Sequence, residues 1–332
     1  MSESGRQKVV IGIIYNQSHN KILLSRRPID VHQGGMLEIP GGKSVLGEVP
    51  SQTLRRELKE EINIQVLKSH RLISYNYDYN DKRINLSAWI VDEWKGVPRG
   101  NEGQAIEWAR ISDLKDLSFP QANMKLINAL NLPLLYFITP DLDRHDDKFF
   151  KKIESLVKNG LRLLQFRSPS TNTSHHKKVL RKLLHICEQH NCSVIYNGSV
   201  HNALKFGAHG AHLNSSRLMG VTKLKLPSNF QVSASCHNED ELKQAERLGL
   251  DFCVLSPVHK SLSHLTSKPI GWNNFSLLVK KIGLPVYALG GIRPDETYIA
   301  RRKGAFGIAM VSGVWDASDP ISVIKMVGKN MF

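Results

Sequence analysis

The sequence is poor in cysteine and in aromatic residues. Only four cysteines occur among 332 residues, and aromatic residues make up 7% of the chain. No C-x-x-C pair is present, and Cys187 and Cys192 have no histidine partner at the spacing of a zinc finger. We therefore expect thiols that pack as small hydrophobic groups in a reducing compartment.

Long hydrophobic runs are also missing. Val9–Tyr15 is among the longest, whereas a membrane-spanning helix needs about 18 apolar residues. The start, Met1–Gln7, is polar and lacks the apolar segment of a signal peptide. We expect a cytoplasmic protein that has no membrane partner.

Acidic residues are outnumbered by basic ones. The chain has 45 Lys and Arg against 30 Asp and Glu, which gives a formal net charge of +15. This balance favours anionic partners, although solvated surface charge would give the same count. The basic residues are scattered and form no long tract, so we expect no direct binding of nucleic acid.

The first half of the chain predicts an α+β arrangement. Strands are expected at 9–16, 21–25, 72–79 and 83–92, and helices at about 51–62 and 122–130. In the first helix, Leu54, Leu58 and Ile62 repeat at i, i+4 and i+8, and Ser51 is the expected N-cap. Asn63 stands where a helix end needs a left-handed residue.

The second half alternates between strands and helices. Eight apolar, strand-like runs occur at 134–138, 161–166, 193–196, 210–213, 231–235, 251–255, 285–289 and 306–310. Helical segments separate most of them, for example 174–189, 239–247 and 295–302. Such alternation predicts an α/β fold, most economically a (β/α)₈ barrel. We therefore expect two domains, 1–130 and 131–332.

The strongest motif is Gly42-x₅-Glu48-x₇-Arg56-Glu57-Leu58-x-Glu60-Glu61-x-Asn63-Ile64. Its glutamates at 57, 60 and 61 project from one face of one helix, where like charges repel unless cations lie between them. Hard ions such as Mg²⁺ prefer carboxylate oxygens and bring phosphate groups with them. Arg56 can pair with one glutamate, and Gly41 allows a backbone carbonyl to approach the ion.

This motif resembles the Nudix box, with Asn63 in place of the second glycine. Residues 8–130 are similar to the MutT branch of that family, which hydrolyses 8-oxo-dGTP to its monophosphate and pyrophosphate. The resemblance implies an α+β Nudix fold with a mixed sheet and the Nudix helix. It rests on GIIYN at 12–16, SRRPIDVH at 25–32, LEIPGGK at 37–43, NEGQAIEW at 101–108 and FPQAN at 119–123.

The same resemblance implies roles for individual residues. Mg²⁺, with Mn²⁺ as the alternative, would be held by Gly41, Glu57, Glu60, Glu61 and Glu102. Either Glu57 or Glu102 would be the general base, and Arg56 would orient a glutamate. The substrate, an oxidised purine nucleoside triphosphate, would meet Arg27, His32, Glu38, Ile39, Pro40, Gly41 and Asn123.

Some of these assignments have alternatives. The alternative for Arg27 and His32 is surface pairing, and the alternative for Asn123 is a helix N-cap. Asn is well suited to reading a purine edge because its amide carries a donor and an acceptor. Ile39 stands where the relatives have an aromatic residue, and Lys82 replaces an arginine, so base affinity is expected to differ.

Residues 133–330 resemble the thiamine phosphate synthase/TenI group. The resemblance rests on Gln165-x-Arg167, Asn197, GAHGAHL at 207–213, SCHN at 235–238, the frame from Pro257 to Trp272, ALGGI at 288–292 and GIAMVSG at 307–313. It implies a phosphate site at Gly290, Gly291, Ser312 and Gly313, although tight barrel turns alone would also need glycine. It also implies Gln165, Arg167, Asn197 and His237 as contacts to a phosphorylated thiamine precursor.

The synthase pattern departs from the family where its chemistry lies. Pro169 replaces a lysine, while Gly198 and Arg217 replace the two metal-binding aspartates. Where the family has the segment T-x-T-K, this chain has Ser261-Leu262-Ser263-His264. Synthase activity is therefore not expected, because a diphosphate leaving group would lack its main charge stabilisation.

Three hypotheses follow. The chain is a hydrolase that removes oxidised guanine nucleotides before polymerases use them, or a thiamine-pathway enzyme that hydrolyses thiamine-type diphosphates. In the third, the barrel is a non-catalytic binding module. The barrel could also transfer protons without a metal through His237, His259 or His264, which would equally suit plain polar loops.

Overall fold

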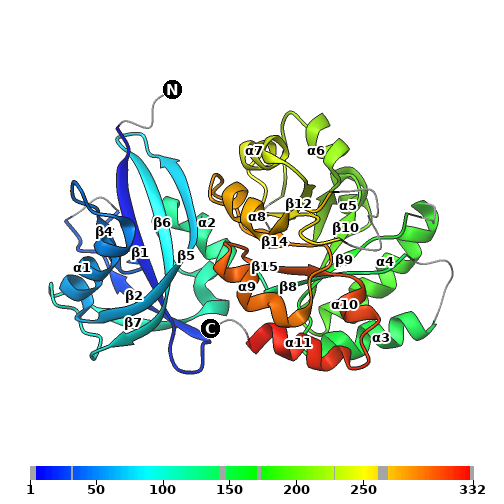
Figure 1. Cartoon of the computed structure of the whole chain (residues 1–332), viewed down its shortest axis with the longest axis horizontal. Coiled ribbons are helices and arrows are strands. Elements are labelled where there is room, and N and C mark those ends of the chain that lie inside the picture. The colour runs from blue at the N-terminus through cyan, green and yellow to red at the C-terminus, as the bar shows by residue number, and fades with distance from the viewer. Residues whose placement is uncertain are drawn as a thin grey trace. The chain divides into compact units, whose positions relative to one another are not determined.

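The computed structural model describes residues 5–30, 33–141, 147–169, 173–227, 229–260 and 268–329. The chain forms two compact units, Met1–Leu132 and Pro133–Phe332 (Figure 1). The predicted residue His32 and the segment Ser261-Leu262-Ser263-His264 lie outside the described residues. Within those residues, no helix is both long enough and apolar enough to cross a membrane.

The first unit combines two small sheets with helices, as predicted. One sheet has the order β4-β1-β6-β5 and consists of β1 (Gln7–Ile14), β4 (Gly41–Lys43), β5 (Gln65–Asp78) and β6 (Arg83–Lys95). It is mixed, because β1 runs parallel to β6 and the other pairs are antiparallel. The antiparallel second sheet has the order β3-β2-β7 and consists of β2 (Lys21–Arg26), β3 (Leu37–Glu38) and β7 (Ile106–Arg110). The helical segments are α1 (Pro50–Ile62), η1 (Ile111–Asp116) and α2 (Gln121–Leu130).

Strand β5 begins at Gln65, several residues before the predicted start at 72. Its pairing with β6 shifts register three times, between Val66 and Lys68, between Lys68 and Ser69, and between Arg71 and Ile73. Each shift interrupts the alternation of inward and outward side chains by which a strand is recognised in a sequence. The sequence-based prediction therefore missed the irregular first half of β5.

Helix α1 packs on the sheet through the predicted apolar stripe. Leu54, Leu58 and Ile62 are fully buried and lie in one cluster with Val10 and other apolar residues of β1 and β6. A Cβ atom at Gly12 of β1 would lie 2.6 Å from Leu58 Cδ1, so glycine lets the helix approach the strand closely.

The start of α1 corrects the predicted cap. The helix begins at Pro50 with Val49 as the N-cap residue, so Ser51 lies inside the first turn. Proline suits the first helical position because a backbone N–H at that position would have no partner within the helix, so its absence costs nothing. The Gln52 Oε1 atom accepts the Val49 N–H at 3.0 Å. At the other end, Asn63 has φ 58° and ψ 32°, which confirms the predicted left-handed residue.

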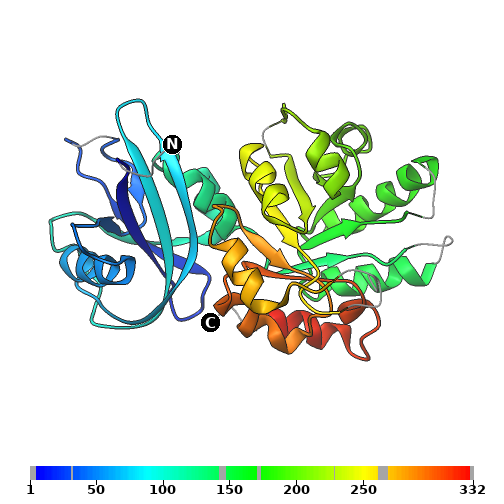
Figure 2. The same cartoon turned by 45° about the horizontal axis from the view of Figure 1, so that its top comes forward.

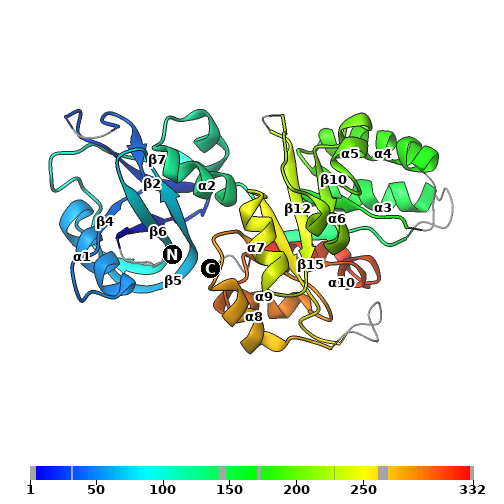
Figure 3. The ribbon, with the colours of Figure 1, turned by 90° about the horizontal axis from the view of Figure 1, so that it is seen from above.

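The second unit is a closed barrel of eight parallel strands, and this confirms the predicted (β/α)₈ fold (Figures 2 and 3). Its strands pair in chain order, and the last pairs with the first. They are β8 (Leu135–Ile138), β9 (Leu163–Phe166), β10 (Ser193–Asn197), β11 (Gly210–Leu213), β12 (Gln231–Cys236), β13 (Phe252–Leu255), β14 (Val286–Ala288) and β15 (Gly307–Met310).

Helices follow most of the strands. They are α3 (Asp147–Lys158), α4 (Thr173–Glu188), α5 (Val200–Lys205), α6 (Ser215–Gly220), α7 (Glu239–Arg247), α8 (Gly271–Val279), η3 (Pro294–Glu296), α9 (Thr297–Arg302), α10 (Ser312–Trp315) and α11 (Pro320–Lys329). The predicted helix at 295–302 is thus divided into a short 3₁₀ turn and α9.

His212 of β11 is buried in the barrel interior, with 1% of its surface exposed. Its Nδ1 atom lies 2.8 Å from the Ser233 hydroxyl, and its Nε2 atom lies 2.8 Å from the Ser235 hydroxyl. Burial, and to a lesser extent the positive charge of Arg167, lower the pKa of His212 to about 3. The ring is therefore neutral in the folded barrel at physiological pH.

We expect Leu58→Ala to destabilise the first unit by about 2–5 kcal/mol, because it leaves a cavity under α1. Hydrogen exchange of the β1 amides should then be faster by about thirtyfold or more. Leu46 is fully exposed, so Leu46→Ala is the matched control and should leave this exchange nearly unchanged. Equal protection in the two variants would contradict the assigned core.

We expect the barrel to lose stability as the pH falls from about 6.5 toward 3. Over this range the unfolded chain binds a proton at residue 212 that the folded barrel does not bind, which costs at most about 1.4 kcal/mol per pH unit. Urea unfolding of the wild type and of His212→Gln between pH 7.5 and 5 measures this contribution. The variant should show a shallower loss of stability, and equal slopes would show that His212 is accessible to protons.

Candidate functional site

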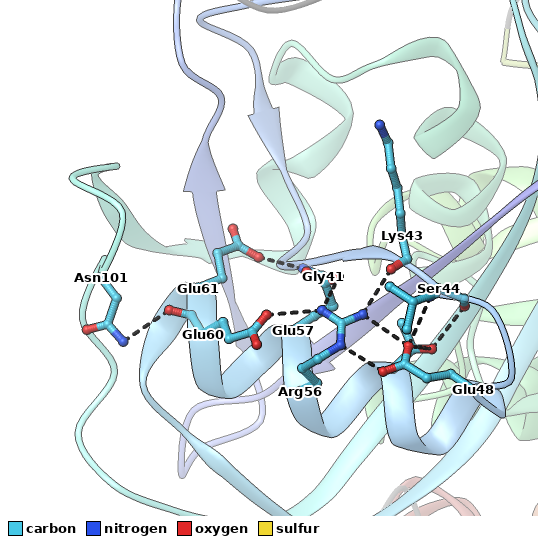
Figure 4. A network of polar contacts seen from close by, with 11 residues as sticks. Gly41, Lys43, Ser44, Glu48, Arg56, Glu57, Glu60, Glu61 and Asn101 are labelled. Atoms are coloured by element: carbon cyan, nitrogen blue, oxygen red, sulfur yellow. Dashed lines mark hydrogen bonds and ion pairs between the residues drawn. The ribbon is translucent and has the colours of Figure 1, made fainter.

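In the candidate active site, Arg56 forms hydrogen bonds with three glutamates of the motif (Figure 4). Its Nη1 atom donates to Glu57 Oε1 at 2.8 Å and to Glu60 Oε2 at 3.0 Å, and its Nε atom donates to Glu48 Oε1 at 2.7 Å. The hydrogen bonds from Arg56 hold the pKa of Glu48 down to about 2. One guanidinium thus reduces the repulsion that the sequence predicts between these carboxylates.

Glu61 points away from Arg56 and ties α1 to two strands. Its Oε2 atom accepts the Gly41 N–H at 2.7 Å, and its Oε1 atom accepts the Ser25 hydroxyl at 2.8 Å. Burial raises the pKa of Glu61 to about 7, although these two hydrogen bonds favour the charged form. Sequence reasoning missed Ser25, because no local pattern marks a strand residue as the partner of a distant glutamate.

The donor set has the chemistry that a hard divalent cation needs. Glu57, Glu60 and Glu61 lie on one face of α1, and carboxylate oxygens are the preferred ligands of Mg²⁺. A Cβ atom at Gly42 would overlap the Glu57 carboxylate, so glycine keeps this space open. Among the described residues, no three metal-binding side chains converge on one point, because Arg56 holds two of the glutamates and Gly41 the third.

A cavity of about 400 Å³ lies beside these carboxylates. It is lined by six of the predicted residues, namely Arg27, Glu38, Ile39, Gly41, Glu57 and Asn123. Pro40, Arg56, Glu60, Glu61 and Glu102 are not among its lining residues. Arg27 forms an ion pair with Glu38 at the cavity wall. Glu102 lies on the loop before β7, and its charge adds to the burial that raises the pKa of Glu38.

Asn123 brings an uncommitted amide to the same cavity. The N-cap residue of α2 is Pro120, so Asn123 lies in the first helical turn and the N-cap alternative is wrong. Only 6% of its surface is exposed. Its backbone N–H donates to Pro120 O at 2.8 Å, but its side chain makes no hydrogen bond within the described part of the chain. The amide is therefore available to a ligand.

Tyr79 is a cavity residue that the sequence analysis did not identify. Its hydroxyl accepts the Ala122 N–H at 3.2 Å, and the Lys82 ammonium lies 5.1 Å from the centre of its ring. Tyr75 and Tyr77 precede it at every second position, and both also bond to the start of α2. The three tyrosines therefore alternate along the hairpin of β5 and β6, with their rings on one face. This spacing was the sequence signal that could have revealed Tyr79.

The barrel carries a larger cavity of about 940 Å³. All eight predicted residues line it, namely Gln165, Arg167, Asn197, His237, Gly290, Gly291, Ser312 and Gly313. Gly290 and Gly291 have positive φ angles of 103° and 64°, and a Cβ atom at Gly290 would lie 2.7 Å from Pro257 Cα. Glycine is therefore required there by the turn itself, whether or not a phosphate binds.

Several polar groups of this cavity are already ordered. Asn197 Nδ2 donates to Gln165 Oε1 at 2.9 Å, and Gln165 Nε2 donates to the Tyr136 hydroxyl at 2.8 Å. His237 Nδ1 lies 2.8 Å from Ser256 O. Because a carbonyl only accepts, the neutral ring carries its proton on Nδ1 and leaves Nε2 as an acceptor. His259 does not line the cavity, and its Nε2 atom lies 3.1 Å from Glu296 Oε1.

Several side chains of this cavity were not predicted as ligand contacts. Among them are His176, Tyr196 and Arg217. The His176 Nδ1 atom lies 2.9 Å from the Tyr196 hydroxyl. No sequence signal linked them, because α4, β10 and α6 meet only in the closed barrel.

Comparison with known proteins assigns a family to each unit. Residues 10–129 match the family described as NUDIX domain. An 8-oxo-dGTP diphosphatase of Escherichia coli is 39% identical over 123 residues, which are 37% of this chain and 95% of that protein.

The barrel has relatives of its own. Residues 135–314 match the family described as Thiamine monophosphate synthase. A thiamine-phosphate synthase of Thioalkalivibrio sulfidiphilus is 29% identical over 188 residues, which are 56% of this chain and 89% of that protein. The structure of a thiamine phosphate pyrophosphorylase from Pyrococcus furiosus shares the fold at 22% identity and a TM-score of 0.50, over 60% of this chain and 96% of that one. The chain thus belongs to the NUDIX domain family through its first unit and to the thiamine monophosphate synthase family through its barrel.

Proposed function

We propose that the first unit hydrolyses 8-oxo-dGTP to 8-oxo-dGMP and pyrophosphate, and so removes an oxidised nucleotide before polymerases use it. One observation carries this proposal: the buried Asn123 amide, uncommitted within the described residues, lines the same cavity as Glu57. A base-reading group and a phosphate-directed carboxylate thus share one pocket. The diphosphatase relative of E. coli supports the same substrate.

Glu57, Glu60 and Glu61, with Gly41 and Glu102, would hold Mg²⁺ or Mn²⁺. Such an ion neutralises phosphate charge and lowers the pKa of bound water. Of the two candidate bases, Glu57 lines the cavity and Glu102 does not, which favours Glu57. The base takes a proton from water, the water oxygen bonds to phosphorus, and the anhydride bond between the α- and β-phosphates breaks. Arg56 positions Glu57 through its hydrogen bond at 2.8 Å.

Asn123 suits an oxidised purine for a chemical reason. Oxidation at C8 places a hydrogen on N7, so the edge of the base changes from an acceptor to a donor at that atom. The Asn123 carbonyl can accept this N7–H while its NH₂ group donates to a neighbouring base oxygen. Unmodified guanine would leave the carbonyl facing an acceptor, and an unsatisfied buried polar group is costly.

We propose that the barrel binds a phosphorylated thiamine precursor in its cavity. The cavity of about 940 Å³ supports this role because it combines the Gly290–Gly291 turn with ordered polar groups and the Nε2 acceptor of His237. Because the first unit is fused to this barrel, a thiamine-type diphosphate is the second candidate substrate of the first unit.

One assay separates these substrates. The purified chain is supplied with Mg²⁺ and with 8-oxo-dGTP, dGTP or thiamine diphosphate, and released pyrophosphate and phosphate are measured separately. We expect a preference for 8-oxo-dGTP with pyrophosphate as the product. Indifference to the oxidised base together with turnover of thiamine diphosphate would overturn the proposed substrate.

Glu57→Gln should lower kcat for 8-oxo-dGTP by about a hundredfold or more, because it removes the candidate base and a metal-binding oxygen. Steady-state kinetics measures this effect. Glu93→Gln is the matched control, since Glu93 pairs with Lys68 on the exposed hairpin, and it should behave like the wild type. Unchanged activity of Glu57→Gln would refute the proposed site.

Asn123→Ala should reduce the ratio of kcat/KM for 8-oxo-dGTP over dGTP by about tenfold or more, because the variant no longer bonds to the oxidised edge. Asn76→Ala changes an exposed asparagine of the hairpin and should keep the ratio. A ratio that is unchanged in Asn123→Ala would show that another residue reads the base.

A further inference from the structure

The barrel cavity does not fit the divalent metal that its family implies. Asp141 is the one acidic side chain among the described residues that line it, and its Oδ1 atom accepts the Ser168 hydroxyl at 3.0 Å. Arg167 and Arg217 line the same cavity. Two fixed positive charges beside one carboxylate repel a divalent cation rather than hold it.

Tyr196 explains why a carboxylate is missing next to Asn197. A Cβ atom at Gly198 would overlap the Tyr196 ring, so the ring fills the space that a side chain at 198 would need. An aspartate cannot be accommodated there unless Tyr196 moves. The absence of an aspartate at position 198 is therefore consistent with the packing of this cavity.

The two arginines are available to a ligand. Arg167 directly follows β9, and Arg217 lies on α6 after β11, so they flank the end of β10. Both residues are exposed, and neither guanidinium forms a hydrogen bond or an ion pair within the ranges that the structure describes. Their charges nevertheless reach cavity residues, because Arg167 lowers the pKa of His212, and Arg217 opposes the burial that raises the pKa of Tyr196.

Resting on the proposed role of the barrel as a phosphate-ligand site, we infer that Arg167 and Arg217 bind the diphosphate group of an organic ligand directly, without a divalent cation. Guanidinium groups stay charged at all physiological pH values and match phosphate oxygens with paired N–H donors. The Gly290–Gly291 turn follows β14, which lies four strands from β10 in the closed barrel. The arginines therefore define an anion subsite on the side of the barrel opposite this turn.

This arrangement predicts an inverted dependence on Mg²⁺. In a site built of carboxylates, the metal bridges protein and diphosphate, so chelation abolishes binding. In the arginine site, the free anion is the better ligand, because complexation with Mg²⁺ lowers the charge that the arginines attract.

Calorimetric titration of inorganic pyrophosphate into the full-length Glu57→Gln protein tests this inference. The measurements are made once with EDTA and once with Mg²⁺. We expect binding with EDTA, no gain with Mg²⁺, and a loss of affinity of about tenfold or more in each of Arg167→Ala and Arg217→Ala made in the same background. Arg181→Ala removes an exposed arginine of α4 outside the cavity and should bind pyrophosphate as the parent does.

Three results would overturn the inference. They are the absence of binding with EDTA in a protein with native circular dichroism, equal affinity in Arg217→Ala and Arg181→Ala, and binding that appears only with Mg²⁺. The milder variants Arg167→Lys and Arg217→Lys keep the charge and should lose less affinity than the alanine variants if direct contacts matter.

Failure of the proposed functions would look different. The pyrophosphate titration does not depend on hydrolysis of 8-oxo-dGTP, so a failed hydrolase assay leaves the arginine site unaffected. Binding of pyrophosphate through the arginines, with no binding of any phosphorylated thiazole or pyrimidine, would refute the proposed ligand and leave the inferred subsite intact.

Discussion

The buried carboxylate of Glu61 holds the candidate active site together. Its two oxygens bond to the Gly41 N–H and the Ser25 hydroxyl, so one side chain joins α1 to β4 and β2. A buried carboxylate without such partners would be strongly destabilising. The same contacts fix α1 beside the backbone at 41–42, where Glu57 meets the cavity. The geometry of the site thus follows from the need to satisfy one buried group.

The two units present opposite charges in their cavities. The first presents carboxylates, partly neutralised by Arg56, and so calls for a cation between protein and phosphate. The barrel presents Arg167 and Arg217 with a single acidic neighbour among the described lining residues, and so can meet an anion directly. The second arrangement agrees with the excess of basic residues in the chain, whereas only the first is suited to activate a metal-bound water.

Local patterns predicted most of the regular structure, and they failed where a contact interrupts the pattern. The stripe Leu54, Leu58 and Ile62 predicted α1 because helical periodicity reflects the face that is buried. The cap was misplaced at Ser51 because Pro50 occupies the first helical position and Gln52 bonds back to Val49. The start of β5 was missed because register shifts hide its alternation.

Residue types at short spacing were sufficient to identify the two families, the alternation of strands and helices in the barrel, and the carboxylates on one face of a helix. The folded structure was needed to show that Asn123 shares a cavity with Glu57 and that the Tyr196 ring fills the place of a side chain at 198. The closed barrel was needed to bring Arg167 and Arg217 to either side of one strand end. Periodicity encodes the faces of a single element, whereas proximity between distant residues depends on strand order, register and barrel closure.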